Sequence, residues 1–154
     1  MAQVEIRLLG PFEVAVGGEP VTAFETDSVR ALLAYLATQA GHPRPRSQVA
    51  ELLWPDRPDG AALSNLRHAL SVLRTALRDR VSTHPVLVAD RTSVAVRASA
   101  DVWVDLVEFD RLAATPADDP QAVARWRDAV DLWRGPLLDG VTIRAGADWE
   151  EWAA

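Results

Sequence analysis

The 154-residue sequence contains no cysteine, no lysine and no apolar run of the length that a membrane helix needs. The absence of cysteine excludes disulfides, thiolate metal ligands and cysteine nucleophiles, and nothing in the chain requires an oxidising compartment. The N-terminus lacks the basic segment and the apolar run of a signal peptide. We therefore expect a soluble, cytoplasmic protein without a membrane partner.

The groups needed for catalysis or metal binding are also missing from the sequence. Three histidines, without cysteine or a spaced carboxylate partner, do not make a metal site. The serines lack an adjacent histidine–acid pair, and no glycine-rich phosphate loop occurs. We expect neither an enzyme nor a bound cofactor.

Charge is divided unevenly along the chain, although the total is −6. Residues 1–100 carry 11 Arg and 10 acidic residues, whereas residues 101–154 carry 5 Arg and 12 acidic residues. Within the first part, residues 42–97 carry 9 Arg and 5 acidic residues, which is a net charge of +4. This distribution predicts a basic module joined to an acidic one, and a basic module fits a nucleic-acid partner.

Apolar periodicity in the first part of the chain predicts a small antiparallel sheet, three helices and a closing hairpin. The expected elements are strands at residues 3–10, 12–16 and 20–22, helices at residues 29–40, from residue 47 and at residues 61–80, and hairpin strands at residues 86–89 and 93–97. Gly17-Gly18 is a hairpin turn signal. Asp27 or Ser28 is the expected cap of the first helix, Gly41 its stop, and Ser47 the cap of the second helix.

A boundary near residues 98–100 divides the chain into residues 1–98 and 99–154. Beyond it, helical patterns cover residues 102–113 and 120–133, and a third begins before the last residue. The fold expected from these patterns is an α+β winged helix-turn-helix, with an N-terminal sheet and a C-terminal hairpin wing, followed by an all-helical segment. Helix pairs of this size are also the units of solenoid repeats.

Residues 61–80 have the strongest functional pattern, because leucines recur every three or four residues along one stripe. The stripe consists of Leu63, Leu66, Leu70, Leu73 and Leu77. At about 100° per residue, the other faces carry Ser64, Arg67, His68, Ser71, Arg74, Thr75 and Arg78. Short polar side chains let a helix approach base edges, and arginines reach phosphates or guanine.

Context decides between two interpretations of this helix. An arginine-bearing face is also common on ordinary amphipathic helices, and His68 fits a base contact or a surface residue without a role. The preceding short helix, the turn and the trailing hairpin, with Arg91 at its tip, favour DNA.

The turn between the two helices has two interpretations of its own. It is long, charged and exposed, so it is either a connection or a docking site for another protein. Its residues are Trp54, Pro55, Asp56, Arg57, Pro58, Asp59 and Gly60.

Several segments resemble a known family. The segments LLAYLATQAGHPRPRSQVAELLWPD, LSNLRHALSVLRTALRD and VLVADRTSVAVR resemble the OmpR/PhoB-type winged helix of the Streptomyces antibiotic regulatory protein family. The segments DVWVDLVEFDRLAA, AVDLWRGPLLDGV and DWEEWAA resemble the start of its bacterial transcriptional activator domain. That second domain normally runs well past this length and is tetratricopeptide-like, so we expect only its N-terminal part here.

The resemblance implies a transcriptional activator that binds direct repeats in promoter DNA, often as side-by-side protomers. It implies that helix 61–80 reads the major groove, that residues 86–97 form the wing, and that residues 54–59 contact RNA polymerase. It also implies possible homo-oligomers on DNA. The alternative hypothesis is a protein-interaction module, in which the winged helix is a scaffold and the helical tail binds a partner.

Overall fold

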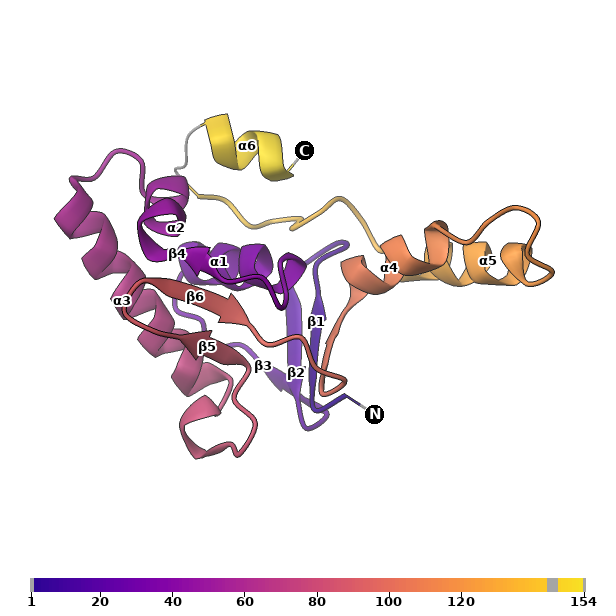
Figure 1. The fold of residues 1–154 in the computed structure, drawn as a ribbon, viewed down its shortest axis with the longest axis horizontal. Coiled ribbons are helices and arrows are strands. Elements are labelled where there is room, and N and C mark those ends of the chain that lie inside the picture. Colours follow the sequence, from indigo (N-terminus) through magenta and orange to yellow (C-terminus); the bar gives the residue numbers. More distant parts are fainter. Residues whose placement is uncertain (1, 144–146, 154) are drawn as a thin grey trace.

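The computed structural model of the protein describes residues 2–143 and 147–153. Figure 1 shows a body of sheets and helices from which one helical arm projects to the right. In chain order the elements are β1 (Val4–Arg7), β2 (Glu13–Val16), β3 (Glu19–Val21), α1 (Asp27–Thr38), β4 (Arg44–Pro45), α2 (Arg46–Leu53), α3 (Asp59–Ala76), the 3-10 helix η1 (Asp79–Val81), β5 (Leu87–Ala89), β6 (Ser93–Val96), β7 (Val102–Val104), α4 (Asp105–Ala113), α5 (Ala122–Leu132) and α6 (Ala147–Ala153). The chain therefore has an α+β fold with two small sheets.

The first sheet has the strand order β3-β2-β1-β7. The predicted antiparallel strands form, and Gly17 and Gly18 make the turn between β2 and β3 at φ values of 60° and 82°. A two-residue hairpin turn needs such positive φ values, which glycine adopts without steric cost.

Strand β7 makes the sheet mixed, because it pairs parallel with β1 and places Val102 beside Val4. The prediction of a purely antiparallel sheet followed by an all-helical segment is therefore wrong at residues 102–104. The sequence pattern predicted one helix over residues 102–113, but the helix begins only at Asp105. A local pattern could not predict this pairing, because the partner strand lies at the other end of the sequence.

Helices α1 and α2 form where predicted, but their N-termini differ from the expected caps. Thr26, rather than Asp27 or Ser28, caps α1, and its Oγ1 accepts a hydrogen bond from the Val29 amide at 3.4 Å. The α2 helix follows Pro45 directly, so Ser47 lies inside the first turn and makes no cap. Each helix therefore begins one or two residues earlier than its expected cap allows.

The leucine seam of α3 packs against the core as expected. Leu66, Leu70 and Leu73 are fully buried, and α3 packs on α1 and α2. The helix runs over residues 59–76 instead of 61–80. After it, Arg78 adopts a left-handed conformation with φ 58°, and the chain turns into η1.

Asp79 explains why the helix ends before residue 80. Its side chain is buried and accepts hydrogen bonds from the amides of Val86 at 2.9 Å and Leu87 at 2.8 Å. A buried carboxylate with two amide donors is well satisfied, so it holds the chain in a turn that leads to β5. The predicted hairpin follows as β5 and β6, which form the second sheet with β4.

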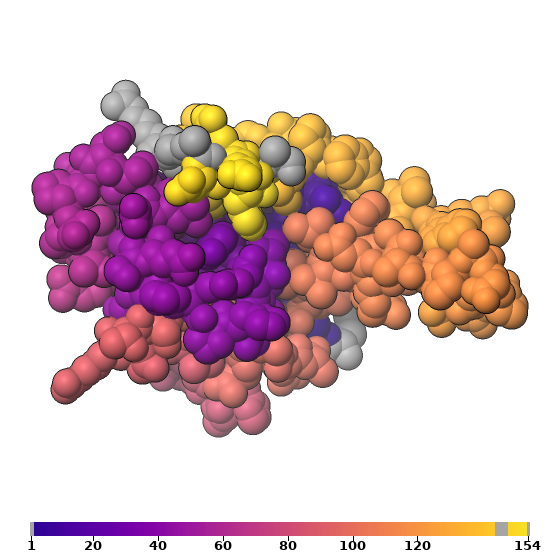
Figure 2. All heavy atoms as spheres, turned by 45° about the horizontal axis from the view of Figure 1, so that its top comes forward, coloured from indigo at the N-terminus to yellow at the C-terminus, as the bar shows by residue number. Residues whose placement is uncertain are grey.

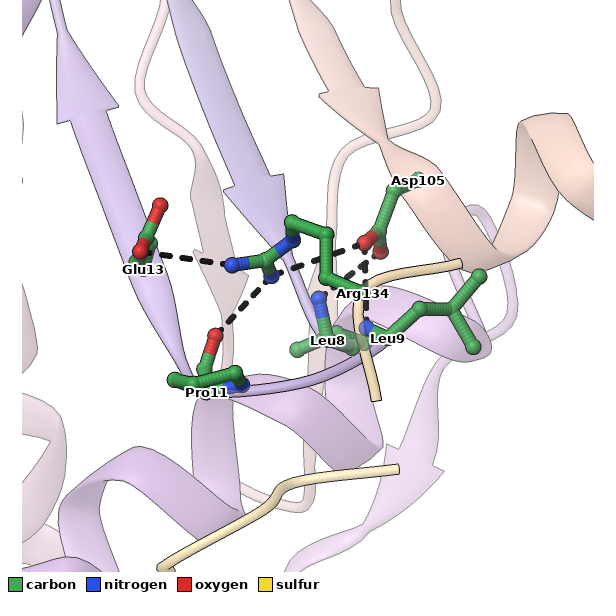
Figure 3. Close-up of polar contacts among 6 residues, drawn as sticks. All are labelled: Leu8, Leu9, Pro11, Glu13, Asp105 and Arg134. Carbon is green, nitrogen blue, oxygen red and sulfur yellow. Dashed lines mark hydrogen bonds and ion pairs between the residues drawn. The ribbon is translucent and has the colours of Figure 1, made fainter. Parts of the chain in front are cut away.

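A second buried aspartate, Asp105, joins the C-terminal part of the chain to the first sheet. Its carboxylate accepts hydrogen bonds from the amides of Leu8 at 2.8 Å and Leu9 at 3.0 Å (Figure 3). Arg134 lies beside it, donates to the Pro11 carbonyl at 2.9 Å and pairs with Glu13 at 3.3 Å. The division into domains at residues 1–98 and 99–154 stays a prediction. In the structure, Asp105 and Arg134 link the second segment to residues 8–13 of the first.

Helix α6 returns to the N-terminal part and covers α1 and α2 (Figure 2, yellow over purple). Trp149 is buried, and the ring of Trp152 meets that of Tyr35 at a centroid distance of 5.3 Å. By contrast, α4 and α5 pack mainly on each other and form the arm that projects from the body in Figures 1 and 2.

Candidate nucleic-acid interface

The solvent-facing side of α3 brings together most of the residues predicted to bind DNA. Ser64, Arg67, His68 and Thr75 are exposed, and Ser71 and Arg74 are half-buried. All of them lie on one helix whose opposite side is anchored in the core by leucine. A helix with this support presents its polar side chains at fixed spacing, as groove reading requires.

Arg80 lies on the same face, although the sequence pattern did not predict it. Its guanidinium donates hydrogen bonds to the Thr75 hydroxyl at 2.6 Å and to the Ser71 hydroxyl at 2.9 Å. On an unbroken helix over residues 61–80, position 80 would fall near the leucine seam, at about 100° per residue. The left-handed turn at Arg78 redirects the chain, so no local signal identifies Arg80.

The contacts of Arg80 define how the two hydroxyls can interact with a ligand. A hydroxyl has one donor and two acceptor positions, and the guanidinium can only donate. Because Ser71 and Thr75 each accept from Arg80, their hydroxyl hydrogens remain available to donate outward. Phosphate oxygens and the N7 and O6 atoms of guanine are acceptors, so this face matches them chemically.

Arg78 is the predicted residue that the structure separates from this face. The prediction placed it on the same shoulder as Arg67 and Arg74, which required the helix to continue. Instead it follows the end of α3 and pairs with Glu19 of β3 at 3.5 Å. Both side chains are largely exposed, so this ion pair is weak and readily exchanged for another partner.

The tip of the β5–β6 hairpin presents Arg91 to solvent. Asp90 accepts hydrogen bonds from the amides of Thr92 and Ser93, both at 2.8 Å, and these bonds lower the pKa of its carboxyl. Arg46, at the start of α2, donates from its Nε atom to the Asp90 carbonyl at 2.9 Å. The tip is therefore held in one shape, with Arg91 at its end.

The connection between α2 and α3 runs from Trp54 to Pro58 and is shorter than the seven-residue turn expected, because α3 begins at Asp59. Pro55 to Asp59 are exposed, and Trp54 is half-buried against the core. A cleft of about 820 Å³ lies between this loop and the start of α1. Its wall includes Thr142, whose amide donates to Asp27 at 3.0 Å, so the C-terminal part of the chain borders the loop.

The acidic α4–α5 arm lies apart from the arginines of α3, whereas α6, which carries Asp148, Glu150 and Glu151, packs on α2. In Figure 1, α3 and the β5–β6 hairpin lie at one end of the molecule, and the α4–α5 arm lies at the other. The acidic residues of the arm therefore do not neutralise the arginines of α3 at close range. Charges separated by more than about 10 Å are largely screened at physiological salt.

Other kinds of site find no support in the described residues. Among residues 2–143 and 147–153, no group of three or more histidine, aspartate or glutamate side chains is arranged to hold a metal ion. No helix in that part of the chain combines the length and apolar character that crossing a bilayer requires.

Comparison with known proteins identifies two relatives. No family model matches the chain. The regulatory protein DnrI of Streptomyces peucetius is 29% identical over 158 residues, which cover 93% of this chain and 56% of DnrI. The chain thus spans about half the length of that relative.

The fold is similar to that of Mycobacterium tuberculosis EmbR, solved in complex with a low-affinity phosphopeptide. The TM-score is 0.74 at 27% sequence identity, and the match covers 92% of this chain and 38% of EmbR. Of the two relatives, DnrI is named as a regulatory protein. The two matches cover 93% and 92% of this chain, so it is similar to these proteins along nearly all of its length, in agreement with the family resemblance of its segments.

Proposed function

We propose that this chain is the DNA-binding part of a transcriptional activator and binds double-stranded promoter DNA sequence-specifically. The observation that carries the proposal is the outer face of α3, where Arg67, Arg74 and Arg80 surround the hydroxyls of Ser71 and Thr75. In this proposal, residues 1–98 are a winged helix-turn-helix whose α3 reads the major groove. Residues 99–154 are the beginning of the activator domain.

The β5–β6 hairpin serves as the wing. Arg91 at its rigid tip contacts a phosphate or enters the adjacent minor groove, where arginine is favoured. His68, beside Ser64 and Arg67 on α3, faces the base edges. Arg78 exchanges Glu19 for a phosphate when DNA approaches, because an exposed ion pair costs little to break.

Residues 54–59, which are the α2–α3 connection and the first residue of α3, serve as the RNA polymerase contact. The charged residues among them, Asp56, Arg57 and Asp59, are exposed, and the connection follows α2 rather than lying on the outer face of α3. A protomer bound through α3 therefore leaves Asp56 and Arg57 available to a protein beside it. Direct repeats in the promoter would place two such protomers side by side.

Selection of bound genomic fragments, followed by footprinting, tests the DNA-binding proposal and reveals the repeat spacing. Replacing Arg67 and Arg74 by alanine should weaken binding to the selected site by about 1–3 kcal/mol for each arginine that reads a base. Arg127→Ala on α5 is the matched control and should leave binding unchanged. A selected site that the double variant binds as tightly as the wild type would contradict the assignment of α3.

Salt dependence distinguishes a DNA-binding domain from a scaffold. Each phosphate neutralised by arginine contributes about −0.9 to the slope of log K against log salt concentration. Absence of sequence-selective binding, together with a flat salt response, would favour the interaction-module alternative.

Transcription in vitro tests the loop separately. Asp56→Ala and Arg57→Ala should reduce transcript yield from the selected promoter while leaving the DNA dissociation constant unchanged. Loss of DNA binding in either variant would overturn the polymerase-contact assignment, because these residues would then belong to the DNA interface.

A further inference from the structure

Arg80 is placed beside the outer face of α3 by the turn that follows the helix. It belongs to η1, which begins after the left-handed residue Arg78. The neighbouring Asp79 is buried and accepts hydrogen bonds from two amides that lead into β5, so the backbone at η1 is held in place. Arg80 therefore returns over the last two turns of α3 in a position that the tertiary structure fixes.

The guanidinium of Arg80 bridges two hydroxyls that lie one helical turn apart. Its Nη1 atom donates to Oγ1 of Thr75 at 2.6 Å, and its Nη2 atom donates to Oγ of Ser71 at 2.9 Å. A guanidinium is planar and presents its donors in a fixed geometry, so these two bonds hold the hydroxyl oxygens at a set spacing. Within residues 2–143 and 147–153, Arg80 forms no ion pair within 4.0 Å, so its charge remains beside the two hydroxyls.

The hydrogens of these two hydroxyls are left for a ligand. A helical hydroxyl commonly donates to a carbonyl of the preceding turn, as Thr38 does to the Tyr35 carbonyl at 2.8 Å. In the part of the chain that the structure describes, Ser71 and Thr75 accept from Arg80 but donate to no protein group. A hydroxyl that accepts from a cation is polarised by it, which makes its own hydrogen a stronger donor.

Ser71 and Thr75 occupy the part of α3 that a groove would bring nearest to the bases. At about 100° per residue, they lie farther round the helix from the leucine stripe than Arg67 and Arg74 do. Short side chains touch only what lies against the helix, and for a helix in the major groove that is the floor of base edges. The two hydroxyls therefore meet bases rather than the phosphates at the rim of the groove.

The charge of Arg80 decides which base edges the pair accepts. A free hydroxyl binds donors and acceptors alike, because its hydrogen rotates to suit the partner. Beside a guanidinium, the amino group of cytosine or adenine is disfavoured because its hydrogens carry positive charge, and an acceptor is favoured. Guanine presents two neighbouring acceptors in the major groove, N7 and O6, with no donor and no methyl group on that edge. Two outward donors held at a set spacing beside a cation therefore match guanine best.

We propose that Arg80 is a positioning residue for base selection, which fixes the Ser71 and Thr75 hydroxyls as donors and makes the pair select guanine in the major groove. The inference rests on the proposed function, because it requires α3 to lie in that groove. It is distinct from a phosphate contact by Arg80. A phosphate contact strengthens binding to every sequence equally, whereas a fixed pair of donors changes the order in which sequences are preferred.

Selection from a random-sequence duplex library tests the inference with the 154-residue chain and with Arg80→Ala. The wild-type chain should select a site in which at least one guanine is required. The variant should still bind that site but lose about five- to ten-fold of the discrimination at that guanine. A wild-type chain that selects no sequence overturns the proposed function and this inference together. A selected site at which every base preference survives in Arg80→Ala overturns the inference alone.

Base analogues locate the contact at single atoms. In the selected duplex, each guanine is replaced in turn by 7-deazaguanine, which lacks the N7 acceptor, or by 6-thioguanine, whose sulfur accepts hydrogen bonds weakly. At one or two guanines the wild-type affinity should fall by about five- to ten-fold, and Arg80→Ala should show less than about a two-fold loss at the same guanines. Equal losses in both proteins at every guanine would mean that Arg80 only neutralises phosphate, and would overturn the inference.

Two further variants separate the positioning role from charge and from direct reading by Arg80. Arg78→Ala is the matched control, since it removes an exposed arginine two residues away and should weaken all duplexes alike while keeping the analogue losses. Ser71→Ala combined with Thr75→Val keeps Arg80 but removes both hydroxyls, and should abolish the analogue losses. Losses that persist in this double variant would mean that Arg80 reads guanine itself, and losses that vanish in Arg78→Ala would mean that charge alone is responsible. Either result overturns the inference.

Discussion

Helices α3 and α5 have the same kind of sequence pattern and opposite surroundings. Both are amphipathic, with apolar residues every three or four positions. The apolar side of α3 is buried on α1 and α2, so its arginine face meets solvent. In α5 only alanines are buried, and Val123, Trp126 and Val130 are exposed. The comparison shows that a periodic pattern identifies a helix and a face but not the partner that covers the face.

The largest difference between the two helices should appear on truncation of an apolar side chain. Leu70→Ala in α3 removes a fully buried side chain and should lower the free energy of unfolding by about 2–5 kcal/mol. Val130→Ala in α5 should change it by less than about 0.5 kcal/mol, because the side chain is already exposed. Urea denaturation measures both. Equal losses would show that Val130 is covered in the folded chain.

A somewhat smaller effect is expected from the aspartates that anchor each region. Asp79→Ala and Asp105→Ala each leave two buried amides without an acceptor, which should cost about 2–4 kcal/mol. For Asp79→Ala, the loss of protection from hydrogen exchange should be confined to the end of α3 and to β5. For Asp105→Ala, it should be confined to the junction between α4 and β1. Hydrogen exchange resolves the two regions. Uniform loss of protection in both variants would mean that the regions unfold as one unit.

Replacing either of two exposed arginines should leave stability unchanged, but the two variants should differ in DNA affinity. Arg80→Ala removes a charge on the α3 face and two hydrogen bonds to hydroxyls, so it should weaken DNA binding by about 1 kcal/mol and reduce the salt slope by about 1. Arg127→Ala on α5 should leave both quantities unchanged. Fluorescence anisotropy over a series of salt concentrations measures them. Equal effects would indicate that DNA contacts both ends of the molecule.

The smallest effects concern two carboxyl groups, one in each region. Amides of Thr92 and Ser93 lower the pKa of Asp90, and the Arg111 side chain lowers the pKa of Glu108. A carboxyl with a lowered pKa stabilises the fold above its unfolded-state pKa, and this contribution disappears as pH falls through the folded value. NMR titration should show the hairpin tip loosening below about pH 4, near the ordinary range of such groups. Asp90→Asn should remove this acid transition at the tip and leave that of α4 intact.

Much of the N-terminal part could be predicted because its signals are local. Gly17-Gly18 specifies a hairpin turn, and the leucines of α3 specify a buried seam, and both are found in the structure. The end of α3 was not predictable, because Asp79 ends the helix by binding amides of residues that follow it in a separate element. Arg80 was missed for the same reason, and the left-handed turn at Arg78 places that residue beside Glu19 instead of on the helix.

The sequence alone determined the helices, the hairpins, the leucine seam and the uneven distribution of charge. Each of these depends on residues within a few turns of one another, so local periodicity and turn chemistry are sufficient. Only the tertiary structure decided that Val102 pairs with Val4 and that Asp105 binds the amides of Leu8 and Leu9. It also decided that Val123 and Val130 of α5 are left in solvent. These outcomes depend on interactions between distant segments, which form or fail to form according to the packing of the whole chain.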